Sequence, residues 1–311
     1  MPSRGLLDRY RRDTVNRRGK TRCHARARPD DIHHTASASA QISPPTPADH
    51  GIEPIVSTNP FHHSRYPRSN AYDAQWVMDN QMGPHALWLL ESLTEVLPIP
   101  AGSKVLDLGC GRAMTSIFLA REFRARVWAT DLWIPAGENQ QRIVDAGVSD
   151  LVTPIHAEAH ALPYAAGFFD VIVSIDAYQY FGTADLYLGY LAEFLRPGGV
   201  LGIVVPAELQ GIGADIPEHL APYWDWEFCC FHGPEWWRTH WTKTTKVTVD
   251  HADTVPEGWR DWLRFNEITL PSLTGWRREA ATSQSLMLEA DHGRHLGFAR
   301  LTATKTAPTH R

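Results

Sequence analysis

The sequence is poor in cysteine and has no long apolar run. Its 311 residues include four cysteines, Cys23, Cys110, Cys229 and Cys230, whose spacing is typical of neither a disulfide framework nor a zinc site. No stretch approaches the roughly 20 apolar residues of a membrane-spanning helix, and the N-terminus lacks the apolar middle region of a secretory signal. We therefore expect a cytoplasmic protein with no membrane partner and no metal site.

Basic side chains are scarce beyond the N-terminus. Residues 1–30 hold ten Arg or Lys against three Asp, whereas the rest of the chain holds 20 basic and 32 acidic side chains. Affinity for nucleic acid rests on basic surface, so the acidic remainder predicts no nucleic-acid partner. The expected partner is a small molecule.

Changes in composition divide the chain into four segments. Residues 1–57 join the basic run to a stretch rich in Ser, Ala, Pro and His without apolar periodicity, which predicts a disordered tail. Residues 58–98 contain aromatic turns and then leucines at near-helical spacing, which predicts an N-terminal helical lid. We expect the main domain at 99–305, with an aromatic cap insertion at about 207–245, and a short tail at 306–311. Both a monomer and a homodimer fit this organisation.

Strand-like and helix-like patterns alternate through the main domain. The expected strands are Lys104–Leu108, Arg126–Thr130, Val152–Ile155, Val171–Ile175 and Val200–Val205, with two late strands at Lys246–Asp250 and Leu296–Ala303. The expected helices are Ala113–Phe123, Glu138–Ala146, Ala184–Leu195, one opening at Pro234, and Glu257–Phe265. This order predicts an α/β fold, a Rossmann-like three-layer α/β/α sandwich with a mostly parallel seven-stranded sheet.

A loop with two glycines follows the first expected strand. Gly109 and Gly111 match the first two glycines of a dinucleotide-binding loop, but Met114 stands where the third would be. Asp107 would repel a pyrophosphate by about 1 to 4 kcal/mol, whereas it could accept bonds from an ammonium group. The loop therefore favours S-adenosyl-L-methionine, a nucleoside with a cationic amino-acid tail, over NAD.

These features resemble the class I S-adenosylmethionine-dependent methyltransferases. VLDLGCG at 105–111 is similar to their first motif, VWATDLW at 127–133 to their second strand, HAEAHALPYAAGFFDVIVS at 156–174 to their third and fourth strands, and LRPGGVLGIVVP at 195–206 to their fifth. Lid and cap motifs such as NQMGP at 80–84 and EWW at 235–237 further resemble a bacterial branch of small-molecule methyltransferase-like proteins, a resemblance that narrows the architecture and not the substrate.

The resemblance implies a set of cofactor-binding residues. They are Asp107, Gly109, Gly111, Asp131, Leu132, Glu158, Ala159 and Ile175. Asp131 would bind the ribose hydroxyls, and Glu158 with Ala159 would meet the adenine edge. Two residues depart from the family pattern: Ala113 stands where a glycine is common, and Glu158 replaces the commoner Asp. Helix capping is the alternative role for Asp131 and for Glu158.

Three residues are candidates for catalysis. Asp176 and Tyr180 follow the fourth strand at the edge that faces the cofactor, and His232 opens the aromatic cap helix. A base is needed only if the acceptor arrives protonated. The alternatives are a turn cap for Asp176, a packed tyrosine beneath the lid for Tyr180, and a helix cap for His232.

The sequence thus predicts an enzyme that moves a methyl group to an O, N or C nucleophile of a small organic molecule by in-line displacement. Three alternatives stay open: a cyclopropane-type lipid methyltransferase, an NAD-dependent oxidoreductase, and a non-catalytic protein that binds S-adenosylmethionine.

Overall fold

A computed structural model describes residues 59–211 and 215–307. The predicted tail at 1–57 lies outside these ranges, as do residues 308–311 of the predicted C-terminal tail. Within the described ranges, every helix is too short or too polar to cross a membrane.

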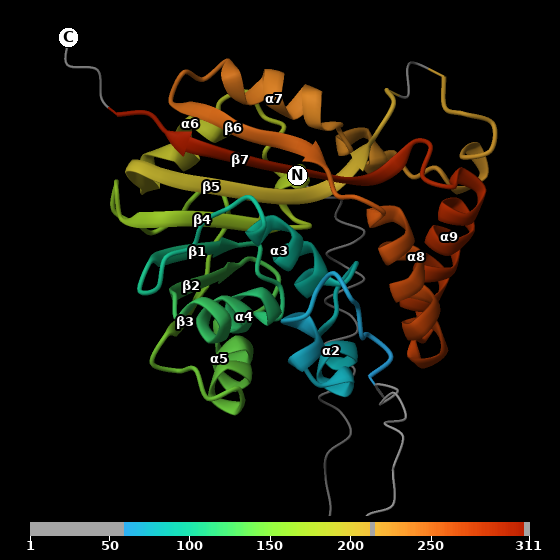
Figure 1. Cartoon of the computed structure of the whole chain (residues 1–311), viewed down its shortest axis with the longest axis horizontal. Helices are drawn as coiled ribbons and strands as arrows, with labels where there is room; N and C mark the ends of the chain where they lie inside the picture. The colour runs from blue at the N-terminus through green and yellow to red at the C-terminus, as the bar shows by residue number, and fades with distance from the viewer. Residues whose placement is uncertain (1–58, 212–214, 308–311) are drawn as a thin grey trace, which may run out of the picture. The chain divides into compact units, whose positions relative to one another are not determined.

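A seven-stranded sheet forms the centre of the described chain. Its strands are β1 (Lys104–Leu108), β2 (Arg126–Asp131), β3 (Val152–His156), β4 (Phe169–Ile175), β5 (Leu195–Glu208), β6 (Val247–Thr254) and β7 (Leu296–Lys305). They lie in the order β3-β2-β1-β4-β5-β7-β6 (Figure 1). The first five are parallel, and β7 runs antiparallel between β5 and β6. The predicted mostly parallel seven-stranded sheet is confirmed.

Helices cover both faces of this sheet. The helices of the described chain, which include others beyond the sheet, are α2 (Ala74–Asn80), α3 (Ala86–Thr94), α4 (Met114–Phe123), α5 (Ala136–Asp145), α6 (Tyr187–Leu191), α7 (Pro234–Thr242), α8 (Gly258–Thr269) and α9 (Gly275–Asp291). Short 3-10 turns η1 (Ser69–Ala71), η2 (Tyr178–Tyr180), η3 (Ala192–Phe194), η4 (Ala221–Tyr223), η5 (Trp226–Cys230) and η6 (Leu270–Ser272) join them.

Neighbouring residues of β1 show how the two layers arise. Val105 packs in an apolar core with α3, α4 and α8, while Leu106 packs in a second core with α6 and α7. Successive side chains of a strand point to opposite faces, so a strand that is apolar throughout needs a helical layer on each side. The three-layer sandwich is the consequence.

Two elements differ most from the sequence prediction. The helix expected at 184–195 shortens to α6 and η3, because Leu195 already pairs with Phe169 and starts the long strand β5. The long helix α9 is absent from the prediction; only five of its residues are buried, among them Met287 and Leu288, so its apolar stripe is narrow. In Figure 1, α8 and α9 lie side by side beyond one end of the sheet.

Candidate active site

The loop after β1 is built from left-handed backbone. Gly109 and Gly111 have φ of 75° and 54°, and Ala113 has φ of 60°. This conformation favours glycine, which explains why a glycine is common where Ala113 stands. A Cβ at Gly109 would lie 2.4 Å from the Cβ of Ala177. The loop therefore contacts the segment that follows β4. This is expected, because the carboxyl ends of the parallel strands β1 and β4 lie at the same edge of the sheet.

Asp131 ties this loop to the end of β2. Its Oδ2 accepts a hydrogen bond from the Gly111 amide at 2.8 Å, and its Oδ1 accepts from the amides of Trp133 and Ile134 at 2.7 and 2.9 Å. Burial raises the pKa of Asp131, and the amides oppose this shift. A carboxylate has about four acceptor positions, so a further donor such as a hydroxyl can still bind. Asp131 thus caps the turn at Trp133 and Ile134 and does not cap helix α5, whose N-cap is Pro135. Its ribose role stays a prediction.

Asp107 is buried beneath the same loop. Its Oδ2 accepts the hydroxyls of Thr115 and Ser116, both at 2.6 Å, in the first turn of α4. Burial raises the pKa of Asp107 to about 6, while the two hydroxyls lower it. The predicted bond to an ammonium group stays a prediction, and α4 already occupies one oxygen.

The ends of β3 and β4 complete this edge of the sheet. The amide of Ala157 donates to the Asp131 carbonyl at 3.1 Å, which brings the β3 loop to β2. There Glu158 is exposed and pairs with His160 at 3.7 Å, so its carboxylate is accessible to a ligand. The remaining predicted cofactor residues differ in exposure: Leu132 is exposed, Ala159 is partly buried and Ile175 is buried.

The lid loop between α2 and α3 lies over two parts of the site. A Cβ at Gly111 would lie 2.8 Å from the sulfur of Met82, and a Cβ at Gly83 would lie 2.5 Å from Oδ2 of Asp176. These two glycines thus bring the lid loop against the glycine loop and against Asp176. One short segment covers both the cofactor edge and the candidate base.

Three arginines from separate elements hold the end of α2 and the start of this lid loop. Arg112 donates to the Asp79 carbonyl at 2.6 Å, Arg142 to the Asn80 side chain at 3.0 Å, and Arg277 to the Gln81 carbonyl at 2.8 Å. They come from the glycine loop, α5 and α9 respectively. The position of the lid loop therefore depends on segments far apart in the sequence.

Asp176 lies directly beyond β4 in left-handed backbone, with φ of 52°. Its Oδ1 accepts from Gln179 Nε2 at 3.3 Å. Burial raises its pKa from 3.8 to about 7, and the Gln179 bond opposes the shift. A carboxyl group with a pKa near neutrality can take up a proton during a reaction, and such shifts are common at functional sites.

The cap segment approaches Asp176 through η5. Burial raises the pKa of Tyr180, and the nearby charges of Asp176 and Glu227 raise it further. Burial also raises the pKa of Cys230 to about 12, with smaller contributions from Cys229 and other groups that include Asp176. The predicted residues Asp176 and Tyr180 are thus close enough for their charges to interact, and Cys230 of the cap lies within the same range of Asp176.

His232 lies apart from this pair in its described contacts. Its ring stacks on Trp236 with centroids 3.6 Å apart and meets the edge of Trp237 at 5.9 Å. Burial lowers the pKa of His232 to about 4, with a smaller contribution from His240. It is a neutral ring packed on α7, and its catalytic role stays a prediction.

Sequence reasoning missed two polar residues of the site. Gln179 Oε1 is buried and has no hydrogen-bond partner in the described part of the chain, so it can accept a bond from a ligand. Asn139 of α5 is buried and donates to the Gly111 carbonyl at 2.9 Å. Gln179 stands inside the loop already singled out, whereas Asn139 gives no local signal because its partner is 28 residues away.

Known proteins are similar to the part of this chain that forms the carboxyl edge of the sheet. The methyltransferase domain family matches residues 105–199, the stretch from β1 into β5 that contains the glycine loop, Asp131 and Asp176. Residues 105–199 are a class I S-adenosylmethionine-dependent methyltransferase domain. The family's cofactor is S-adenosylmethionine.

Relatives of this methyltransferase domain support the assignment. Methyltransferase GfsG of Streptomyces halstedii is 31% identical over 176 residues, which are 54% of this chain and 55% of that protein. Erythromycin 3''-O-methyltransferase of Saccharopolyspora erythraea is 34% identical over 142 residues, 43% of this chain and 45% of that protein. The chain thus spans about half the length of the curated relatives it matches.

The fold of the methyltransferase domain is also found among solved structures. Phosphoethanolamine N-methyltransferase 2 of Haemonchus contortus, solved with S-adenosyl-L-methionine, has a TM-score of 0.62 at 17% identity. The match covers 81% of this chain and 60% of that one. At this identity the likeness concerns the fold.

Proposed function

We propose that this protein transfers a methyl group from S-adenosylmethionine to an O, N or C nucleophile of a small organic molecule. One observation carries the proposal: the glycine loop and Asp176 lie under the same lid loop, with Met82 against Gly111 and Gly83 against Asp176. Methyl transfer needs donor and acceptor aligned and shielded from water, and a shared lid meets both needs.

The described residues fit the cofactor on its nucleoside side. Gly109 and Gly111 allow the left-handed turn that brings the loop amide of Gly111 to Asp131. Asp131 keeps an acceptor position for a ribose hydroxyl, and exposed Glu158 is accessible for the adenine edge. When bound, S-adenosylmethionine supplies an electrophilic methyl group.

The residues at the end of β4 would serve the acceptor. Asp176 in its ionised form can hold an amine or hydroxyl and take its proton, and Gln179 Oε1 can orient the same group through a hydrogen bond. Tyr180 lies close enough to Asp176 and to Glu227 of the cap for their charges to interact, so it would stand beside the acceptor. Erythromycin 3''-O-methyltransferase, by its name, modifies a hydroxyl group, which makes a hydroxyl acceptor the first choice for a screen.

Calorimetry of the full chain tests the cofactor. We expect S-adenosylhomocysteine and S-adenosylmethionine to bind and NAD not to bind, with at least tenfold weaker binding in Asp131→Ala. Asp170→Asn is the matched control, because Asp170 also accepts a backbone amide, that of Lys104 at 2.8 Å, but at the opposite end of β4. Binding of NAD alone would overturn the proposal in favour of an oxidoreductase.

A second experiment separates catalysis from binding. Methyl-labelled S-adenosylmethionine is incubated with small-molecule alcohols, amines and lipid vesicles, and label transfer is followed for wild type and Asp176→Asn. We expect transfer to a small molecule, lost in the variant while its cofactor affinity is kept. Transfer to lipid alone would favour the cyclopropane-type enzyme, and full activity of the variant would remove Asp176 from the acceptor site.

The remaining expectations from the sequence stay predictions. They are the cytoplasmic location, the absence of a nucleic-acid partner, and a monomeric or homodimeric state.

A further inference from the structure

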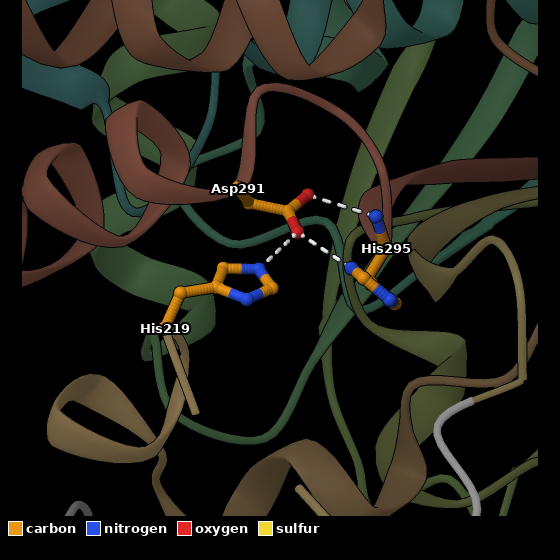
Figure 2. A group of neighbouring side chains, drawn as sticks. All are labelled: His219, Asp291 and His295. Carbon is orange, nitrogen blue, oxygen red and sulfur yellow. Dashed lines mark hydrogen bonds and ion pairs between the residues drawn. The ribbon is translucent and has the colours of Figure 1, made fainter. Parts of the chain in front are cut away.

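Two imidazoles and a carboxylate converge at the junction of the cap, α9 and β7. His219 Nε2 lies 3.1 Å from Asp291 Oδ1, and His295 Nδ1 lies 2.9 Å from the same oxygen. In Figure 2 the two rings approach Asp291 from different sides, His219 from the cap segment and His295 from the turn into β7. All three donor atoms lie within 4.8 Å of one another.

The carboxylate of Asp291 is held rigidly in place. Its Oδ2 accepts the backbone amides of His295 and Leu296, both at 2.9 Å, and the residue is fully buried. These bonds turn Oδ1 toward the two imidazoles. Hydrogen bonds of this kind orient the ligands of metal sites.

A second acid stands beside this group. Glu208 ends β5 opposite Leu296 and is near enough to His295 for their charges to interact. Its Oε1 is buried and has no hydrogen-bond partner in the described part of the chain. A buried carboxylate oxygen without a hydrogen-bond partner is costly, and a bound cation would compensate it.

We propose that His219 Nε2, Asp291 Oδ1 and His295 Nδ1 bind a divalent transition metal of the zinc type. Imidazole nitrogen with carboxylate oxygen is a donor set for such ions, whose bonds of about 2.0–2.2 Å at the tetrahedral angle place neighbouring donors about 3.3–3.6 Å apart. The two imidazole-to-carboxylate distances, 2.9 and 3.1 Å, are a few tenths of an ångström shorter, so the donors would separate slightly to admit the ion. Both histidine side chains are partly exposed, at 25% and 20%, which leaves room for water ligands.

The site would join the cap to the main domain. His219 precedes η4 in the cap, and its partner Asp291 ends α9, 72 residues further along the chain. An ion bound to both would restrain the cap where it meets the sheet edge that carries the candidate active site. The separation in sequence also explains why residue spacing indicates no metal site.

Cobalt(II) is the probe, since its visible absorption reports nitrogen and oxygen ligands. Full-length protein, freed of metal with a chelator and carrying no histidine tag, is titrated with cobalt and then with zinc. The variants are His219→Ala and His295→Gln. His251→Ala is the matched control, because His251 and Asp253 form an ion pair at 2.9 Å and the described residues supply no third ligand beside it. Each variant is first shown to be folded by circular dichroism, a check that does not depend on the proposed function.

We expect wild type and His251→Ala to bind one cobalt ion, which zinc displaces, and both site variants to bind at least tenfold more weakly. Histidines in residues 1–58 can also bind cobalt, so the test rests on the difference in cobalt affinity between wild type and the variants. Equal cobalt binding in all four proteins would overturn the proposal, as would the absence of binding in wild type. The cluster would then only hold the cap in place through hydrogen bonds.

Discussion

Replacing Asp176 by Asn removes a charge that folding has to bury. Burial raises the pKa of Asp176 from 3.8 to about 7, and one unit corresponds to about 1.4 kcal/mol. A raised folded-state pKa means that the folded protein binds the proton more tightly than the unfolded chain. The stability contribution is therefore present at low pH and is lost as pH rises from about 4 through about 7.

The magnitude follows from the same shift. Above pH 7 the ionised carboxylate costs folding up to about 4 kcal/mol, and at pH 5 less than half of that. Water reaches part of the side chain, so we expect about 2 to 4 kcal/mol at pH 8. Asparagine suits the left-handed backbone at this position and keeps an oxygen for Gln179. Asp176→Asn should therefore stabilise the protein at pH 8 and have a smaller effect at pH 5.

Urea unfolding of wild type and variant at pH 5, 6.5 and 8 measures this difference. Asp170→Asn serves as a control of opposite sign: burial acts to raise the pKa of Asp170, but the Lys104 amide and Arg196 lower it overall. This control should be destabilising at pH 8. The reasoning is refuted if the stability gap between wild type and Asp176→Asn is the same at all three pH values, or if the variant is less stable at pH 8.

Two further predictions concern packing. Gly111→Ala should lower the free energy of unfolding more than Gly147→Ala and should weaken S-adenosylhomocysteine binding in calorimetry. Both glycines have positive φ, but only a Cβ at Gly111 would lie 2.8 Å from Met82. Equal losses of stability in the two variants would contradict the lid contact. Trp237→Ala should lower the free energy of unfolding in urea by about 3–5 kcal/mol, since Trp237 is fully buried. Trp236→Ala should lower it by under about 1 kcal/mol, because Trp236 is 38% exposed. Similar losses in the two variants would contradict the burial of Trp237 in the cap core.

Local patterns were sufficient for the central sheet. β1 has the predicted bounds, and β2 extends one residue beyond them to Asp131, because strand and helix periodicities are properties of neighbouring residues. The same is true of the glycine loop and of Asp176 beyond β4. Helix α9 was missed because its partner α8 and the cap, and not its own weak stripe, supply its packing.

The sequence by itself determined the order of elements, the glycine loop and the family of the domain, since each depends on residues close together in the chain. Only the tertiary structure decided that Met82 and Gly83 cover Gly111 and Asp176. It also decided that His219 meets Asp291 across 72 residues. Such pairs leave no local pattern, because contacts between distant segments arise when separate apolar surfaces are buried together.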